Sequence, residues 1–295
     1  MVDTHCTSTC TVGKYLFKED VLARRNLLNL IANATTEDVT KEFVTDLNYA
    51  IEKYEKTDKR SPSNTLKPSS IRCVRSGVFQ VLGVPMNEEP ANSNLIGICE
   101  SGTFVHEMIQ GKVLRMKEIG LNWEYINVTE YVKSHNLNLE IKKECDFEAG
   151  EFETKLYDPV RNISFLCDGI LKHGRKYYIF EIKSISNGKF YSTKEVPAKY
   201  KDQAIAYSEL LGIEDVLFLF VDRDLYNKKS FLYTPTEEER QGWRDRVEYA
   251  LECIRDSKIP TKPNFADRSF CAYCPYTDIC NQVGDEESEY NRETI

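Results

Sequence analysis

The sequence contains no long apolar run, and no basic segment followed by an apolar one lies at its start. No stretch approaches the roughly 20 apolar residues that a membrane-spanning helix needs. The first ten residues, MVDTHCTSTC, also lack the features of a secretory signal. We therefore expect a cytoplasmic protein that makes no membrane contact.

Positive charge is also in deficit, because the formal net charge is -8. This argues weakly against a nucleic-acid partner, since contact with DNA depends on where the cations cluster. The charges are partly segregated: residues 183–203 contain five lysines against one glutamate and one aspartate. Residues 283–295 form an acidic tail, for which we expect disorder.

The 295 residues suffice for one large domain or two modest ones, and 41% of them are hydrophobic, which allows a sizeable core. Helical spacing of apolar residues predicts helices at 14–33 and 37–56. The polar, proline-containing stretch 57–70 is typical of a linker. We therefore expect a helical segment at 1–60, which could bind a partner or self-associate, and a main domain that starts near residue 66.

The main domain alternates between helical and strand-like patterns. Pro197 and Gly212 suit the two ends of a helix, and Thr236 with Glu239 forms a capping box at the start of another. The run DVLFLFVD is almost continuously apolar, as in a strand buried on both faces of a parallel sheet. This order favours an α/β sandwich whose mixed central sheet is flanked by helices. We expect helices at 71–82, 100–118, 197–211 and 237–257, and strands at 137–147, within 163–184 and at 215–222.

The run ISFLCDGILKHGRKYYIFEIKS predicts two strands joined by a two-residue turn at Gly174-Arg175. The resulting register places Asp168 directly opposite Glu181, with Cβ atoms about 5 Å apart. Lys183 lies two residues beyond Glu181 and so points to the same face. Two opposed carboxylates repel each other unless a hard divalent cation lies between them. A lysine beside that cation can stabilise the charge that develops during phosphodiester hydrolysis.

The alternative is a surface hairpin on which Asp168, Glu181 and Lys183 form an ordinary charge network. This alternative has weight because an aspartate followed by Glu-x-Lys is common by chance. The neighbouring residues favour the metal site, since Phe165, Leu166, Ile179 and Phe180 are apolar. The three charges therefore lie in otherwise buried strands, where charged groups need a partner or a metal.

Spaced motifs in this region are similar to those of the PD-(D/E)XK nucleases of the RecB exonuclease type. They are Asp168 with Glu181-Ile182-Lys183, Gln203 with Tyr207 on the following helix, and Gly102 with His106 on an earlier helix. The iron–sulphur branch, which includes the AddB nuclease domain and the CRISPR-associated RecB-like exonucleases, adds one upstream and three downstream cysteines. They correspond here to Cys73, Cys271, Cys274 and Cys280. The resemblance covers about residues 66–282 and departs from the family motif at Cys167, which stands in place of proline.

The resemblance implies a restriction-endonuclease-like core in which Asp168 and Glu181 bind Mg²⁺ or Mn²⁺. It implies His106 and the backbone carbonyl of Ile182 as further ligands, and an imidazole ligand makes Mn²⁺ a good cofactor. Lys183 would position the attacking water or stabilise the transition state. A lone histidine on a helix is more often a core residue, and only the match to the family favours the ligand role for His106.

The resemblance also assigns roles to the helix that follows the hairpin. Gln203 and Tyr207 are four residues apart and share one helix face, which would look toward the active site. Gln203 would hold a phosphate or a metal-bound water, and Tyr207 would stack or hydrogen-bond near the substrate. Packing of Tyr207 into the core is the alternative. Lys199 and Lys201 lie nearby and are candidates for contact with the DNA backbone.

Ten cysteines are many for a cytoplasmic protein, in which clustered cysteines more often bind metal than form disulfides. The resemblance implies a [4Fe–4S] cluster that closes the C-terminal segment onto the start of the domain, with zinc as the competing occupant. Its implied ligands are Cys73, Cys271, Cys274 and Cys280. The fallback ligands are Cys6, Cys10 and Cys99. We expect burial as small hydrophobic residues for Cys145, Cys167 and Cys253.

The function implied by the resemblance is that of a metal-dependent DNA nuclease. An exonuclease on single-stranded DNA or DNA ends is expected, in recombination, repair or end processing. Two alternatives stay open: a structure-specific endonuclease, and a non-catalytic DNA-binding or scaffold subunit that keeps the fold and the cluster. Intact Asp168, Glu181 and Lys183 argue against the scaffold subunit.

Overall fold

The computed structural model describes residues 36–55, 63–87, 92–263, 268–285 and 287–289. The chain divides into two compact units, Met1–Asp58 and Lys59–Ile295. In the first unit the structure describes helix α2 (Thr36–Glu55), which agrees with the helix predicted at 37–56. The helix predicted at 14–33 lies outside the described residues.

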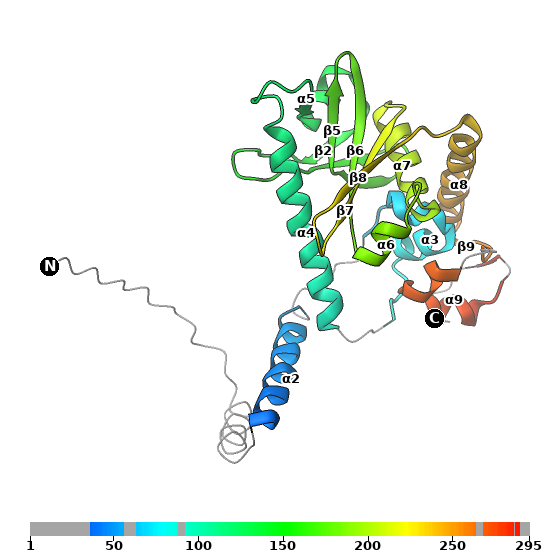
Figure 1. The fold of residues 1–295 in the computed structure, drawn as a ribbon. Coiled ribbons are helices and arrows are strands. Elements are labelled where there is room, and N and C mark those ends of the chain that lie inside the picture. Colours follow the sequence, from blue (N-terminus) through cyan, green and yellow to red (C-terminus); the bar gives the residue numbers. More distant parts are fainter. Residues whose placement is uncertain (1–35, 56–62, 88–91, 264–267, 286, 290–295) are drawn as a thin grey trace. The chain divides into compact units, whose positions relative to one another are not determined.

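A five-stranded mixed sheet forms the centre of the second unit, in the order β1–β5–β6–β7–β8 (Figure 1). Strands β6 and β7 run parallel, and the other neighbouring pairs are antiparallel. The predicted α/β class with a mixed central sheet is therefore confirmed. The bounds are β1 (Glu124–Ile126), β5 (Gly169–His173), β6 (Lys176–Ile185), β7 (Val216–Asp222) and β8 (Lys228–Tyr233).

The helices of the second unit follow the predicted order, with corrections at some ends. Helix α4 begins at Ser93 rather than near residue 100, because the Asn92 side chain accepts hydrogen bonds from the first backbone N–H groups and caps it there. The capping box of Thr236 and Glu239 is present. The bounds are η1 (Pro68–Arg72), α3 (Val74–Leu82), α4 (Ser93–Leu114), α5 (Val128–Ser134), α6 (Asn187–Ser192), α7 (Ala198–Leu211) and α8 (Glu237–Arg255).

Helices cover both faces of the central sheet (Figure 1). On one face, Val105 of α4 and Ile182 of β6 belong to one buried cluster. On the other face, α7 and α8 close a larger core that contains Ile179 of β6. Because successive side chains of a strand alternate between its faces, Glu181 and Lys183 share the α7 side with Ile179.

The turn between β5 and β6 is the predicted one. His173 pairs with Lys176, and the register continues to Gly169 opposite Phe180. Gly174 has φ +63°, and Arg175 is not among the residues with a positive φ. A type II′ turn has this combination, because only its first central residue takes a positive φ. This short turn fixes the register along the whole hairpin and brings Asp168 close to β6.

A second, three-stranded sheet is formed by β2 (Glu140–Lys143), β3 (Thr154–Asp158) and β4 (Ile163–Cys167) in that order. We expected one strand before the turn, and this is wrong: the run divides at Asp168 into β4 and β5. The reason is that β4 pairs with β3, whereas β5 pairs with β1 in the other sheet. The chain must therefore bend between them, and Asp168 stands at the junction of the two sheets.

The C-terminal part of the second unit contains β9 (Lys258–Ile259), η2 (Arg268–Tyr273), α9 (Thr277–Val283) and β10 (Ser288–Glu289). Strand β10 pairs with β9, so two residues of the acidic tail form a strand where we expected disorder. Tyr276 packs edge-on against Phe79 of α3 and joins this segment to the start of the unit. Among the described residues, no helix combines the length and the apolar character needed to cross a membrane.

Candidate metal centre

Asp168 is held in place by hydrogen bonds from three neighbouring groups. Its side-chain Oδ2 accepts a hydrogen bond of 2.7 Å from the backbone N–H of Ile182. Its backbone carbonyl accepts hydrogen bonds from the side chains of Gln110 and Tyr125. The next residue must be glycine, because a Cβ on Gly169 would lie 2.5 Å from the Tyr125 hydroxyl. The carboxylate is therefore oriented by the protein itself.

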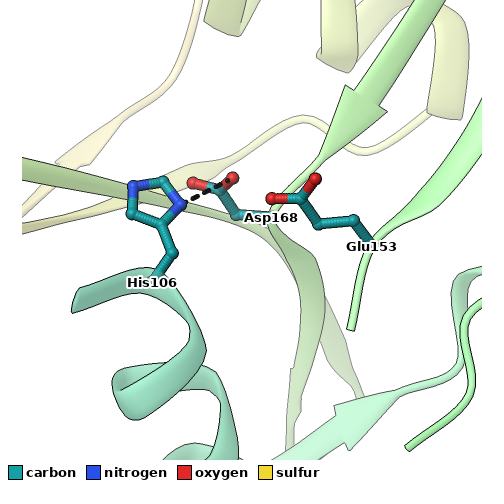
Figure 2. Close-up of side chains that lie close together, drawn as sticks. All are labelled: His106, Glu153 and Asp168. Carbon is teal, nitrogen blue, oxygen red and sulfur yellow. Dashed lines mark ion pairs between the residues drawn. The ribbon is translucent and has the colours of Figure 1, made fainter. Parts of the chain in front are cut away.

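His106 reaches Asp168 from α4, with 3.3 Å between Nδ1 and the carboxylate Oδ1 (Figure 2). Burial lowers the pKa of the imidazole, but the hydrogen bond and the charge of Asp168 outweigh burial and raise it above its usual value. Gly102 lies one turn earlier on α4, where an added Cβ would meet no atom within 4 Å among the described residues. The structure thus brings His106 to the predicted centre.

Glu153 is a residue that the sequence interpretation missed. One ligand atom from each of His106, Glu153 and Asp168 lies within 4.8 Å of the others (Figure 2). Thr154 pairs with Cys167 in the β3–β4 ladder, and Glu153 and Asp168 are the next residues in that register. Burial and the charge of Asp168 raise the pKa of Glu153. The register would have revealed this residue had β3 been predicted.

Glu181 is almost completely buried, with 2% of its surface exposed. Its Oε1 lies 2.5 Å from Nζ of Lys183, whereas Oε2 is buried and has no hydrogen-bond partner in the described part of the chain. Burial, with a further contribution from Asp168, raises the pKa of Glu181 to about 7. The carboxylate is thus costly to keep charged unless a cation approaches it.

Lys183, Gln203 and Tyr207 form a hydrogen-bonded row. Nζ of Lys183 donates to Oε1 of Gln203 (3.0 Å), and Nε2 of Gln203 donates to the Tyr207 hydroxyl (2.7 Å). The hydroxyl in turn donates to the carbonyl of Leu166. The Tyr207 ring is buried in the core against Phe165. Tyr207 thus combines core packing with a polar contact beside the centre.

The charge of Lys183 is maintained by its neighbours. Burial lowers the pKa of the ammonium group, but Glu181 and Asp168 outweigh burial and raise it. Lys199 and Lys201, on the first turns of α7, lie over the rings of Tyr200 and Tyr233. Neither of these two lysines is part of the row that reaches Glu181.

The groups around Asp168 suit a hard divalent cation. Carboxylate oxygens are the ligands that such cations prefer, and His106 adds a nitrogen ligand that transition metals accept. Oε2 of Glu181 is a buried oxygen without a hydrogen-bond partner among the described residues. The Ile182 N–H is engaged by Asp168, and the role of its carbonyl as a ligand stays a prediction.

Four predicted cluster ligands, Cys73, Cys271, Cys274 and Cys280, line one small cavity of about 40 Å³ beside α3 and α9. Burial, with the other three thiols, raises the pKa of Cys73 to about 11. No three of these four sulphurs lie within 4.8 Å of one another.

The remaining cysteines are separate from this cavity. Cys99 is exposed on α4, and Cys6 and Cys10 lie outside the described residues. Cys167 and Cys253 are buried as expected. Cys145 is only partly buried, because it lies in the loop after β2 rather than in a strand.

Comparisons with known proteins give one family match. Residues 136–281 match the sequence model of the PD-(D/E)XK nuclease superfamily. A search of curated proteins finds no match.

Similar solved structures include the crystal structure of SSO0001, with 15% identity and a TM-score of 0.42 over 80% of this chain and 96% of that one. LHK-Exo in complex with dAMP and the alkaline exonuclease LHK-Exo from Laribacter hongkongensis each show 11% identity and a TM-score of 0.39. They are matched over 66% of this chain and 89% of theirs.

Proposed function

Because residues 136–281 form a domain of the PD-(D/E)XK nuclease superfamily, we propose that this chain hydrolyses DNA phosphodiester bonds with a divalent metal ion. The proposal rests on the arrangement of Asp168, Glu181 and Lys183. The backbone N–H of Ile182 orients Asp168, and Ile182 lies between Glu181 and Lys183 on β6. The charges of an ordinary surface network would be solvated, whereas Glu181 is 2% exposed and its Oε2 has no hydrogen-bond partner among the described residues.

Asp168, Glu181 and His106 would hold Mg²⁺ or Mn²⁺, as the motif resemblance implies, together with the carbonyl of Ile182. We add Glu153 to this set, because it lies in the same group as His106 and Asp168. A cation bound there would acidify a water molecule and neutralise charge on the scissile phosphate. The protein's own contribution is to orient Asp168 and to keep it close to His106 and Glu153.

Lys183 is the residue that would stabilise the charge developing on the phosphate or position the attacking water. Its ammonium group is fixed between Glu181 and Gln203. Gln203 is itself held by Tyr207, so a buried ring anchors the row. We propose that Gln203 and Tyr207 position Lys183, and that Lys199 and Lys201 contact the DNA backbone.

We propose residues 66–282 as the nuclease domain, with a [4Fe–4S] cluster bound by Cys73, Cys271, Cys274 and Cys280. The shared cavity of the four cysteines supports the site. The preference for iron–sulphur over zinc rests on the motif resemblance alone, because four thiolates suit either occupant. The cluster would tie the C-terminal segment to α3.

The finer function that we propose is exonuclease action on single-stranded DNA or DNA ends, in recombination, repair or end processing. This proposal is supported by the similarity of the motifs in this chain to those of the RecB-type exonucleases. A contact for a protein partner or a second copy is proposed for residues 1–60.

The test uses protein purified without oxygen and end-labelled linear and circular single-stranded DNA, with Mg²⁺, Mn²⁺ or EDTA. Metal-dependent loss of the linear DNA alone is the expected result. Cleavage of the circular DNA as well would make the protein an endonuclease. Intact DNA under every condition, from folded protein with bound metal, would instead favour a DNA-binding scaffold.

A further inference from the structure

A groove of about 920 Å³ lies on the outer face of the three-stranded sheet and is separate from the metal-binding group. Its walls are the segment before η1 and the helix α7, and its floor is formed by side chains of β2, β3 and β4. We propose that this groove binds a single strand of DNA and leads it to the centre at Asp168. This inference rests on the proposed nuclease function and assigns the path of its substrate.

The groove is basic although the chain as a whole is acidic. Lys67, Lys142 and Lys155 line it, and no carboxylate is among its lining residues in the described part of the chain. Lys142 is paired with Glu140 at 2.5 Å, whereas Lys67 and Lys155 have no carboxylate partner within the described ranges. In a protein of net charge -8, such a surface is the kind that attracts phosphates.

The floor also offers a surface on which a base can stack. Tyr157 is half-buried, its hydroxyl donates to Oδ1 of Asn162 (3.1 Å), and Nζ of Lys142 lies 5.0 Å from its ring centre. In the β3–β4 ladder Lys155 is opposite Leu166, whose side chain is 44% exposed. An aromatic ring beside lysines binds unpaired bases without regard to sequence, and this favours a single strand over a duplex.

The groove shares two residues with the row beside Glu181. Gln203 and Tyr207 line it, and Gln203 accepts a hydrogen bond from Lys183. Leu166, which also lines the groove, precedes Asp168 by two residues. A strand lying along the floor therefore contacts Gln203, the hydrogen-bond partner of Lys183.

The hollow that contains two of the proposed metal ligands has the reverse charge. It has a volume of about 640 Å³ and is lined by His106, Glu107, Glu151 and Glu153, against Lys143 alone. Lys143 is itself paired with Glu151 at 2.7 Å. This hollow suits a cation and offers no basic surface along which a polynucleotide could lie, so the length of the strand is expected along Lys155 and Tyr157.

The test measures binding of a labelled oligothymidylate by fluorescence anisotropy in EDTA, over a range of salt concentrations. The double variant Lys67→Gln, Lys155→Gln should bind about tenfold more weakly at low salt, and the slope of log K against log salt should fall by about 1.4. The matched control is Lys133→Gln, Lys228→Gln, which removes two exposed lysines outside the groove and should leave both values unchanged.

The stacking surface is tested by Tyr157→Ala, which should weaken single-strand binding about tenfold, and by Tyr157→Phe, which should restore it. Retained Mn²⁺ affinity and circular dichroism show that each variant is folded. If the wild type hydrolyses DNA but the groove variants bind like the control, or if duplex binds as tightly as the single strand, the groove assignment is wrong. If the wild type hydrolyses no DNA, the proposed function fails; the anisotropy measurement in EDTA then decides separately whether the groove binds a single strand.

Discussion

The backbone N–H of Ile182 donates a hydrogen bond of 2.7 Å to Oδ2 of Asp168 and so joins the two halves of the proposed metal centre. Asp168 stands at the junction of two sheets, and Ile182 lies between Glu181 and Lys183 on β6. Any displacement of the junction would therefore move Asp168 relative to both of these residues. The orientation of Asp168 does not depend on a metal ion, because the peptide group of Ile182 maintains it.

Asp168→Asn tests this relationship. The asparagine oxygen can still accept the Ile182 hydrogen bond, so the variant should fold while metal affinity falls by about 100-fold or more, because a charged ligand is lost. Asp168→Ala should additionally lower the free energy of unfolding of the metal-free protein by about 1–3 kcal/mol, because a buried N–H loses its partner. Calorimetric titration with Mn²⁺ and urea unfolding measure the two effects. Equal stability of the two variants would contradict the account.

The raised pKa of Glu181 predicts a pH dependence of metal binding. In the metal-free protein this pKa is about 7, so below that pH a metal ion must displace a proton. Mn²⁺ affinity should therefore rise at least tenfold per pH unit up to about pH 7, because the proton of His106, whose pKa is also raised, must be displaced as well. An affinity that is flat between about pH 5 and pH 8 would show that Glu181 does not bind the metal.

The same shift predicts the pH dependence of stability. The folded-state pKa lies above the ordinary value of 4.5, so the contribution of Glu181 to stability is fully present below that value and is lost as the pH rises through about 7. The melting temperature of the metal-free protein should therefore fall over this interval, and Mn²⁺ should restore it at the upper end. Thermal unfolding with and without Mn²⁺ measures both effects.

Glu153→Gln tests the residue that the sequence interpretation missed. It removes one carboxylate from the group with His106 and Asp168, so Mn²⁺ affinity should fall about tenfold or more while the fold is retained. The matched control is Glu151→Gln, two residues earlier in the same hollow; its exposed carboxylate pairs with Lys143. Equal Mn²⁺ affinity in both variants would exclude Glu153 as a ligand.

The shared cavity of four cysteines predicts bound iron. Protein prepared without oxygen should contain iron and sulphide, with about four of each per chain. Cys73→Ser should lose them and become less stable, whereas Cys253→Ser, a buried cysteine outside the cavity, should retain them. Wild-type protein that contains zinc and no iron would show that zinc, rather than an iron–sulphur cluster, occupies the site.

The parts of the centre that could be predicted from the sequence depend on local geometry. The turn at Gly174 fixes the register of the hairpin, and four-residue spacing places Gln203 and Tyr207 on one face of α7. Glu153 could not be predicted, because β3 is a short strand of a second sheet, and the chain enters the central sheet from that one through a bend at Asp168. That bend results from pairing with two different sheets, and no local pattern in the sequence indicates it.

The most direct test of the central claim is the nuclease activity of Lys183→Ala, compared with Lys172→Ala on the same hairpin. Lys183 is partly buried and hydrogen-bonded to Glu181 and Gln203, whereas Lys172 lies over the Tyr177 ring on the other strand. With Mn²⁺ and single-stranded DNA, the account predicts that Lys183→Ala loses about 100-fold or more of the hydrolysis rate and that Lys172→Ala keeps it. Equal activity of the two variants would show that the hydrolytic centre is not located on this hairpin.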